Sequence, residues 1–153
     1  MDKKLKRTYE MVQSYRILSM SKKVFVTEKE ARMFLKSALP KRQDGRFWYY
    51  KSNAISCNSE DVFVFLRYDG RIIGCGVVES SIKKHCEHCG FSYEGYYQFY
   101  PDTVKVFKAA LTKEVVQKYI PTIDSLGNQG TKKIDEQVRE YYDAFIKLLE
   151  ENI

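Results

Sequence analysis

The chain has 153 residues, of which 44% are apolar and 30% are charged, and it contains only three prolines and eight glycines. A chain of this length can bury a core in one domain without metal or disulfide staples. The composition excludes a disordered or fibrous protein. The formal net charge is +6, and no apolar run approaches the ~20 residues that span a membrane. Because the N-terminus also lacks a signal-peptide pattern, the sequence predicts a cytoplasmic protein without a membrane partner.

Charge and aromatic rings are both distributed in an unusual way. Residues 1–51 carry 14 Lys and Arg against five Asp and Glu, whereas residues 52–153 carry 12 against 15. A basic region of this kind attracts nucleic acid or acidic proteins, or only keeps the protein soluble. The rings, 12 Tyr, 9 Phe and 1 Trp, make up 14% of the chain. We therefore expect some of them at a working surface in addition to the core.

The first forty residues predict two helices with a short strand between them. Residues 3–15 place apolar side chains at helical spacing among lysines, which indicates a basic amphipathic helix or a loosely held arm. Residues 23–26 indicate a short strand. Thr27 and Glu30 then form a capping box, in which each side chain satisfies a free backbone amide. Apolar residues recur on one face up to Pro40, so we expect a helix of about three turns here.

The middle of the chain predicts a sheet. Residues 47–51 have the aromatic density of a strand, and residues 61–68 form the clearest strand, which is apolar on both faces for much of its length. Asp69 and Gly70 are typical of a tight hairpin turn, because both of its central positions need a positive φ. In the partner strand, residues 71–79, Gly74 and Gly76 indicate a bulge or the close approach of another backbone or a ligand.

The last third adds two strands and two helices. The strands are expected at residues 93–100 and 103–107. Thr112 and Asp135 are expected to cap the two helices, with a glycine-containing loop at residues 126–131 between them. The sum is an α+β fold of about five to six strands, with about three helices packed in one layer against a curved sheet or small barrel. Residues 16–153 are expected to form a single domain, and residues 1–15 its N-terminal helix or arm.

The cysteines are expected to be reduced thiols, because no secretory signal is present: Cys57, Cys75, Cys86 and Cys89. Cys86 and Cys89 have the C-x2-C spacing that lets two thiolates reach one Zn²⁺. Completing a zinc site would need His85 or His88 together with Cys57 or Cys75. Because the second half of a zinc motif is absent, we expect no cofactor, with structural zinc as the alternative.

Recognition chemistry is better represented than catalytic chemistry. The sequence lacks the nucleophile-elbow, P-loop, dinucleotide-binding and zinc-protease motifs. Residues 41–53, in contrast, hold four cations and four consecutive rings, and rings stack on bases while Lys and Arg neutralise phosphates. On a strand, Trp48 and Tyr50 point to one face and Phe47 and Tyr49 to the other, so one pair can be core while the other lines a pocket. The alternative is that all four rings pack in the core or along an edge strand.

The order of these elements resembles the PUA-like superfamily, and within it the EVE, ASCH and YTH domains. EVE domains commonly run from a Trp-bearing segment through a GD-x-V-x-F strand and a G-I-x-G-x-G-x-V strand to a QG element before the last helix. At these places the chain has EDVFVF at residues 60–65, IGCGVV at residues 73–78 and QGT at residues 129–131. The resemblance covers about residues 16–150.

The resemblance implies a pseudo-barrel that takes a modified or unpaired base of DNA or RNA into an aromatic pocket. Position relative to the family pattern and residue type then suggest the site residues. Two are expected to stack on the base, two to read its edge and two to close the pocket: Trp48 and Tyr50, Ser52 and Asn53, and Asn128 and Gln129, respectively. Four cations are expected to hold the flanking phosphates: Lys41, Arg42, Arg46 and Lys51.

Such domains bind rather than catalyse, so the resemblance favours a protein that is not an enzyme and that works with a nuclease or another effector protein. Two alternatives stay open. One is a protein-interaction module, encoded by a mobile element, whose aromatic and basic surface meets an acidic protein. The other is a small amidohydrolase like some ASCH relatives, which act on modified cytidine with a lysine, a threonine and a glutamate. That set has no matching positions in this chain.

Overall fold

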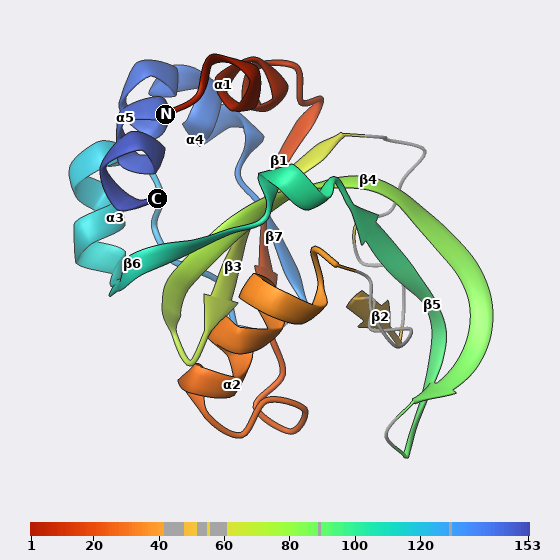
Figure 1. The fold of residues 1–153 in the computed structure, drawn as a ribbon. Helices are drawn as coiled ribbons and strands as arrows, with labels where there is room; N and C mark the ends of the chain where they lie inside the picture. The colour runs from red at the N-terminus through yellow and green to blue at the C-terminus, as the bar shows by residue number, and fades with distance from the viewer. Residues whose placement is uncertain (42–47, 52–54, 56–60, 89, 129) are drawn as a thin grey trace.

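The computed structural model describes residues 1–41, 48–51, 55, 61–88, 90–128 and 130–153 (Figure 1). Seven strands in this part of the chain form one mixed sheet: β1 (Ser14–Ser19), β2 (Trp48–Tyr50), β3 (Val62–Tyr68), β4 (Arg71–His88), β5 (Phe91–Phe99), β6 (Lys105–Leu111) and β7 (Thr131–Lys133). The helices are α1 (Lys3–Glu10), α2 (Glu28–Met33) with its π-helical continuation η1 (Phe34–Ala38), the short 3-10 helix η3 (Pro101–Thr103), α3 (Lys113–Tyr119), α4 (Asp135–Glu140) and α5 (Tyr142–Asn152). The α+β class is confirmed, but the described residues form seven strands and five α-helices rather than the five to six strands and three helices predicted.

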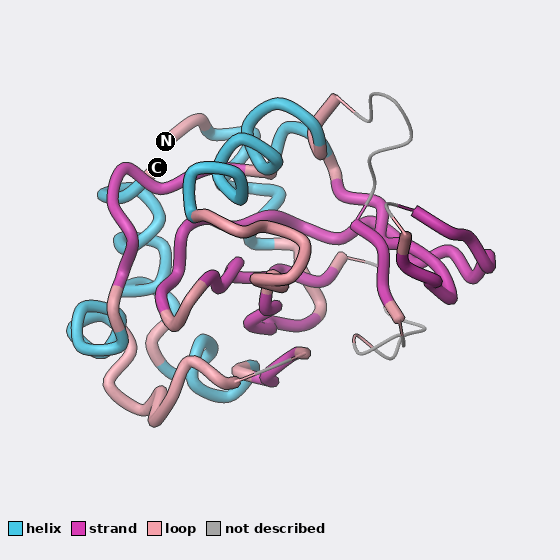
Figure 2. Tube along the Cα trace, turned by 90° about the horizontal axis from the view of Figure 1, so that it is seen from below, coloured by secondary structure: helices cyan, strands magenta, loops and turns pink. Residues whose placement is uncertain are grey.

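The strand order is β2-β5-β4-β3-β1-β7, and β6 also pairs with β4. β1 runs parallel to β3, while the other pairs in the described residues are antiparallel. The predicted partner strand of residues 71–79 is much longer, because β4 continues to His88 and carries the Cys/His segment. Beyond the body of the sheet, β4 and β5 curve away as a two-stranded ribbon (Figures 1 and 2).

Helices cover both faces of the sheet, so the prediction of a single helical layer was wrong. The cause is β3, whose residues alternate between two cores. Phe63 and Phe65 pack with α1, α3, α4 and α5, whereas Val62, Val64 and Leu66 pack with α2, η1 and β2. A strand that is apolar on both faces needs a cover on each. Among the described residues, no helix has the length and apolar character to cross a membrane.

The predicted strand at residues 23–26 is a turn. The backbone amides of Val24 and Phe25 both donate to the carbonyl oxygen of Ser21, at 3.2 and 2.9 Å, and Val24 and Val26 are 43% and 70% exposed. The first strand of the sheet is instead β1 (Ser14–Ser19), whose first two residues the sequence analysis placed in the N-terminal helix or arm and whose remainder it assigned to no element. β1 is recognisable only through its partners, because it lies between β3 and β7.

The N-terminal helix α1 is fastened to the domain by Tyr9. This side chain is fully buried in the core. Its hydroxyl donates a hydrogen bond to the carbonyl oxygen of Thr103 at 2.9 Å and lies 3.6 Å from the sulfur of Cys75. Residues 3–10 are therefore a packed helix and not a loose arm.

The capping box and the hairpin turn are confirmed. The hydroxyl of Thr27 accepts from the amide of Glu30 at 3.2 Å, and the Glu30 carboxylate accepts from the amide of Val26 at 3.0 Å. At the β3–β4 turn, Asp69 and Gly70 have φ values of 49° and 80°, as this turn requires.

The last helix is broken in two at Tyr141, where φ is −119° and ψ is 41°. Asp135, predicted to cap it, lies in its first turn and accepts a hydrogen bond from the amide of Tyr15 in β1 at 2.7 Å. This carboxylate is 4% exposed, and Lys133 approaches its other oxygen at 3.8 Å. Asp135 thus joins the helix to the sheet rather than capping it.

Gly95 of β5 fixes the place where β2 joins the ribbon. Tyr50 pairs with Gly95, and a Cβ atom at Gly95 would overlap both the Tyr50 hydroxyl and the carbonyl oxygen of Ile82. The Tyr50 ring lies across the strand in the space that a side chain would take, and its hydroxyl donates to Ile82 at 3.3 Å. Glycine in a strand interior often marks such a close approach.

Replacing Gly95 by valine should displace the Tyr50 ring and lower the free energy of unfolding by at least about 2 kcal/mol. Urea denaturation followed by circular dichroism measures the change. The control is Ser92→Val on the exposed side of the same strand. Equal stability of the two variants would show that Tyr50 does not depend on the missing side chain.

Candidate functional site

Trp48 and Tyr50, the predicted base-stacking residues, are part of the core. Each is 7% exposed. The Trp48 ring lies 6.1 Å from the ring of Phe34 and 5.9 Å from that of Phe99, and the Tyr50 ring lies 4.9 Å from that of Tyr97. Burial, followed by the charge of Glu94, raises the pKa of Tyr50. Side chains alternate between the two faces of β2 as predicted, but the face that carries Trp48 and Tyr50 is the buried one. The assignment of these two rings to the base-binding surface was therefore wrong.

Tyr49, on the opposite face of β2, is partly exposed. Its ring stacks on that of Tyr93 at 5.2 Å with an interplanar angle of 29°, and meets the ring of Tyr96 edge-on at 6.1 Å. Tyr93 is only 8% exposed, whereas Tyr96 is partly exposed. Tyr93 and Tyr96 thus restrict the rotamers of Tyr49 before any ligand is bound. Binding would therefore cost this side chain little additional conformational entropy.

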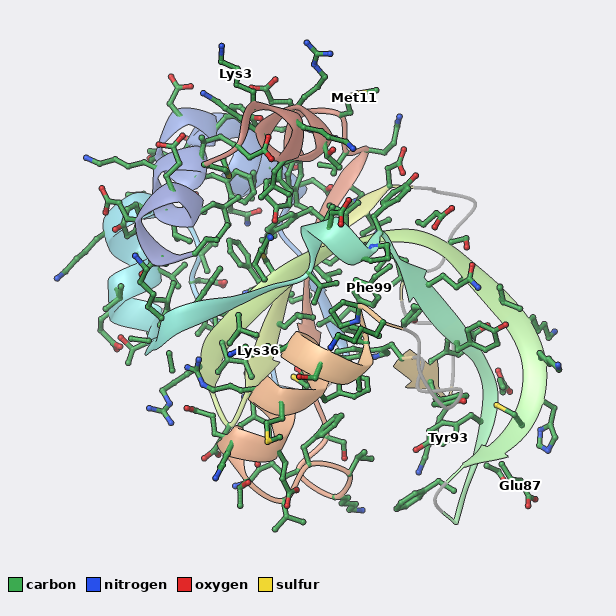
Figure 3. All side chains as sticks on the ribbon, viewed as in Figure 1. Lys3, Met11, Lys36, Glu87, Tyr93 and Phe99 are labelled. Atoms are coloured by element: carbon green, nitrogen blue, oxygen red, sulfur yellow. The ribbon has the colours of Figure 1, made fainter. Side chains whose placement is uncertain are left out.

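Lys51 extends this cluster toward the tip of the ribbon. Its ammonium group lies 5.2 Å above the centre of the Phe91 ring, a cation–π distance. Phe91 lies 6.4 Å from the ring of Tyr93, and it is partly exposed. We call Tyr49, Phe91, Tyr93 and Tyr96 the aromatic strip. It lies on the β4–β5 ribbon and its neighbour β2, where Figure 3 labels Tyr93.

The structure describes the other predicted contact residues only in part. Asn128 is exposed, and its carbonyl oxygen accepts a hydrogen bond from Arg67 at 2.6 Å. It lies next to β7, at the other end of the strand order from β2. Lys41 is exposed shortly after η1, and Lys51 is exposed directly after β2. Five predicted residues lie outside the described part of the chain: Arg42, Arg46, Ser52, Asn53 and Gln129.

Two residue sets were missed at the sequence level. The first is the part of the aromatic strip on β5, Phe91, Tyr93 and Tyr96; Gly95 was a usable signal for it, because a glycine in a strand makes room for a ring from the next strand. The second is Arg16 on β1, whose Nε atom is buried without a hydrogen-bond partner. Arg16 pairs with Val64 on one side and Lys133 on the other, so two cations meet at this edge of the sheet. Arg16 could not be singled out, since no strand was predicted at residues 16–19.

A zinc site that uses Cys75 is contradicted. Cys75 is fully buried beside Tyr9, and Cys86 lies eleven positions further along the same strand, β4. Because a strand rises about 3.3 Å per residue, the two cysteines are much too far apart along β4 to bind the same metal ion. His85 is exposed and Cys86 partly buried on the ribbon. Cys57, Cys89 and the side chain of His88 lie outside the described part, and the described residues contain no metal-binding group of three or more ligands.

No protein-family model matches the sequence, and no curated protein resembles it significantly. Among solved structures, the fold is similar to the NMR structure of Rpa0253 from Rhodopseudomonas palustris, a structural genomics target. The TM-score is 0.52, with 11% sequence identity over 89% of this chain and 92% of that chain. At this identity the similarity concerns the fold alone.

Replacing Trp48 by alanine should cost about 3–5 kcal/mol of stability, because it opens a cavity between Phe34 and Phe99. Chemical denaturation with a far-ultraviolet signal measures the loss. Tyr49→Ala, which removes a partly exposed ring from the same strand, is the control and should cost clearly less. A Trp48 variant as stable as the native protein would contradict the burial of this ring.

Burial raises the pKa of the Cys75 thiol to about 12. At about pH 8 the thiol is therefore protonated, and the native protein should leave Cys75 unmodified by iodoacetamide while Cys86 reacts. Peptide mass mapping gives the extent at each site, and protein unfolded in urea should be modified at both. Rapid modification of Cys75 in the native state would contradict the packing of α1 over it.

Proposed function

We propose that this chain is a PUA-like nucleic-acid-binding domain that holds an unpaired or modified base of DNA or RNA against its aromatic strip. The observation that carries the proposal is the stack of Tyr49 on Tyr93, at 5.2 Å, with Tyr96 beside it and Lys51 at the end of the same strand. Partly exposed rings next to a cation are the groups that single-strand binders use.

Stacking explains why the rings would be arranged in this way. One base on an aromatic side chain contributes about 1–3 kcal/mol, provided that the ring does not lose much freedom on binding. The buried Tyr93 supports Tyr49 from one side, so that Tyr49 is already oriented. In this proposal Tyr49 and Tyr96 take the stacking role that the sequence suggested for Trp48 and Tyr50.

The charge around the aromatic strip supports a short site. Three exposed cations lie near the strip: Lys51 directly after β2, and Lys83 and Lys84 on β4. Gly95 of β5 pairs with Lys83 on one side and with Tyr50 on the other. Glu87 and Glu94 are exposed on the same ribbon and offset part of this charge. A few phosphate contacts are therefore expected, and most of the binding free energy should come from stacking. Ser52 and Asn53, which follow Lys51 in the sequence, remain the proposed readers of the base edge.

The curvature of the ribbon supports the PUA-like part of the proposal. β4 and β5 bend around β2 (Figure 1), so that the short strand lies inside the bend. The amidohydrolase alternative has no support in the described residues.

Alanine at Tyr49 or Tyr96 should weaken the binding of a short single-stranded oligonucleotide about tenfold, because each ring loses a stacked base. Fluorescence anisotropy with labelled DNA and RNA, with and without a modified cytosine, measures the affinity. Tyr49→Phe keeps the ring and should bind almost normally. Tyr119→Ala on α3, away from the ribbon, is the control for a general effect of removing a tyrosine.

The same titration at several salt concentrations tests the electrostatic part. Lys51→Gln should reduce the slope of log K against log salt by about 0.7, the value for one phosphate contact on a single strand. If the native protein binds none of these oligonucleotides at low salt, the proposal is wrong. If it binds them and both tyrosine variants keep full affinity, the site lies elsewhere on the domain.

A further inference from the structure

A hollow of about 360 Å³ lies between the α2–η1 helix and strand β6, on a different part of the protein from the aromatic strip. Its lining is Glu28, Lys29, Arg32, Met33, Lys36 and Val106. Five of these residues come from one helical segment, and Figure 3 labels Lys36 on it. We call this hollow the α2–β6 groove.

The helix exposes this side because its other side is used by the core. Ala31 and Leu35 are fully buried under the sheet. Lys29, Met33 and Lys36 are four and three residues apart along the helix, so they form one stripe, and all three are exposed. The stripe is thus a face of α2–η1 that no described part of the chain covers.

The groove has one cation that is held by hydrogen bonds, Arg32, and two lysines that are not in ion pairs among the described residues, Lys29 and Lys36. Arg32 donates to Glu28 at 3.1 Å and to the carbonyl oxygen of Phe107 in β6 at 2.6 Å, which fixes its guanidinium between helix and strand. Glu28 also accepts from Arg71 at 2.9 Å. The groove lining therefore holds one carboxylate and three cations, and it attracts negative charge.

The surface here is also apolar. Met33 is 56% exposed, and Val106 contributes the β6 side of the groove from the margin of the second core. Val24 and Val26 are also exposed, but they precede the helix and are not part of the groove lining. Exposed apolar groups that gather beside cations are typical of a protein-binding surface, and methionine adapts to the shape of a partner.

We infer that the α2–β6 groove binds an acidic segment of a partner protein, whose carboxylates meet Lys29, Arg32 and Lys36 while one apolar side chain lies on Met33 and Val106. A phosphate backbone would pair with the cations but would make no apolar contact with Met33 and Val106. An apolar peptide would match the apolar side chains but not the three cations. This inference goes beyond the proposed nucleic-acid function and uses none of its residues.

The probe for the test is a fluorescein-labelled synthetic peptide in which leucines alternate with pairs of glutamates. Fluorescence polarisation at low salt should show saturable binding to the native protein. The variant Lys29→Glu/Lys36→Glu should bind at least tenfold more weakly, and Met33→Ser several-fold more weakly. The matched control Lys113→Glu/Lys118→Glu makes the same charge change on the exposed side of α3 and should stay within twofold of the native affinity.

Three outcomes would overturn the inference. The first is no binding of the peptide, and the second is an equal loss in the groove variant and the α3 control, which would reduce the effect to net charge. The third is a groove variant that binds the peptide normally but loses oligonucleotide affinity, which would make the groove a phosphate-binding surface. Tyr49→Ala separates the two functions, because it should leave peptide binding intact whether or not the oligonucleotide binds.

Discussion

The architecture depends on a change of partner along one edge of β4. Its first residues pair with β6 at Ile72–Cys75, and from Val78 onward the same edge pairs with β5. Val77 lies at the junction, where neither strand supplies its ladder partners. Its amide donates to the hydroxyl of Thr103 at 2.9 Å, and its carbonyl accepts from the amide of Tyr100 at 3.0 Å. The turn between β5 and β6 thereby closes a gap in a buried ladder, where unpaired backbone groups would be costly.

The junction explains why two glycines precede it. A Cβ atom at Gly76 would meet the ring of Phe99 and the side chain of Val104, and one at Gly74 would overlap the carbonyl oxygen of Lys105. The crossing chain therefore lies directly on β4. Tyr9 reaches the same point from α1 and binds Thr103. The junction divides the protein into a helix-covered body and a curved ribbon, and the two candidate surfaces lie one on each part: the α2–β6 groove on the body and the aromatic strip on the ribbon.

Signals within a few residues predicted caps and turns correctly, but they did not predict which face of a strand is buried or which strands pair. Thr27 with Glu30, and Asp69 with Gly70, act within a few residues, so the sequence located both the cap and the turn. Gly74 and Gly76 indicated a close approach, which was right, although the approaching chain was not identifiable. The alternation at residues 48–50 was also right, but a period of two does not say which face is buried. That choice rests on Gly95, about 45 residues later, because only there can the Tyr50 ring cross the strand. Arg16 was beyond prediction, since its position follows from the pairing of β1 with β3 and β7.

The folded structure divides the helical cations of the basic first third between the two faces of the sheet. Four of its cations lie on α1, which packs on the same face as α4 and α5 (Figure 1), where six carboxylates face only two cations. Opposite charges brought onto one face reduce the field of each other at distance. The cations of α2 and η1 lie on the other face of the sheet and have only Glu28 and Glu30 beside them. Three cations of the first third, Lys29, Arg32 and Lys36, therefore keep a positive charge at the α2–β6 groove, while Lys51 lies over Phe91 in the aromatic strip. Because the groove lining shares no residue with the aromatic strip, a partner protein and a base can be bound without competing for the same surface.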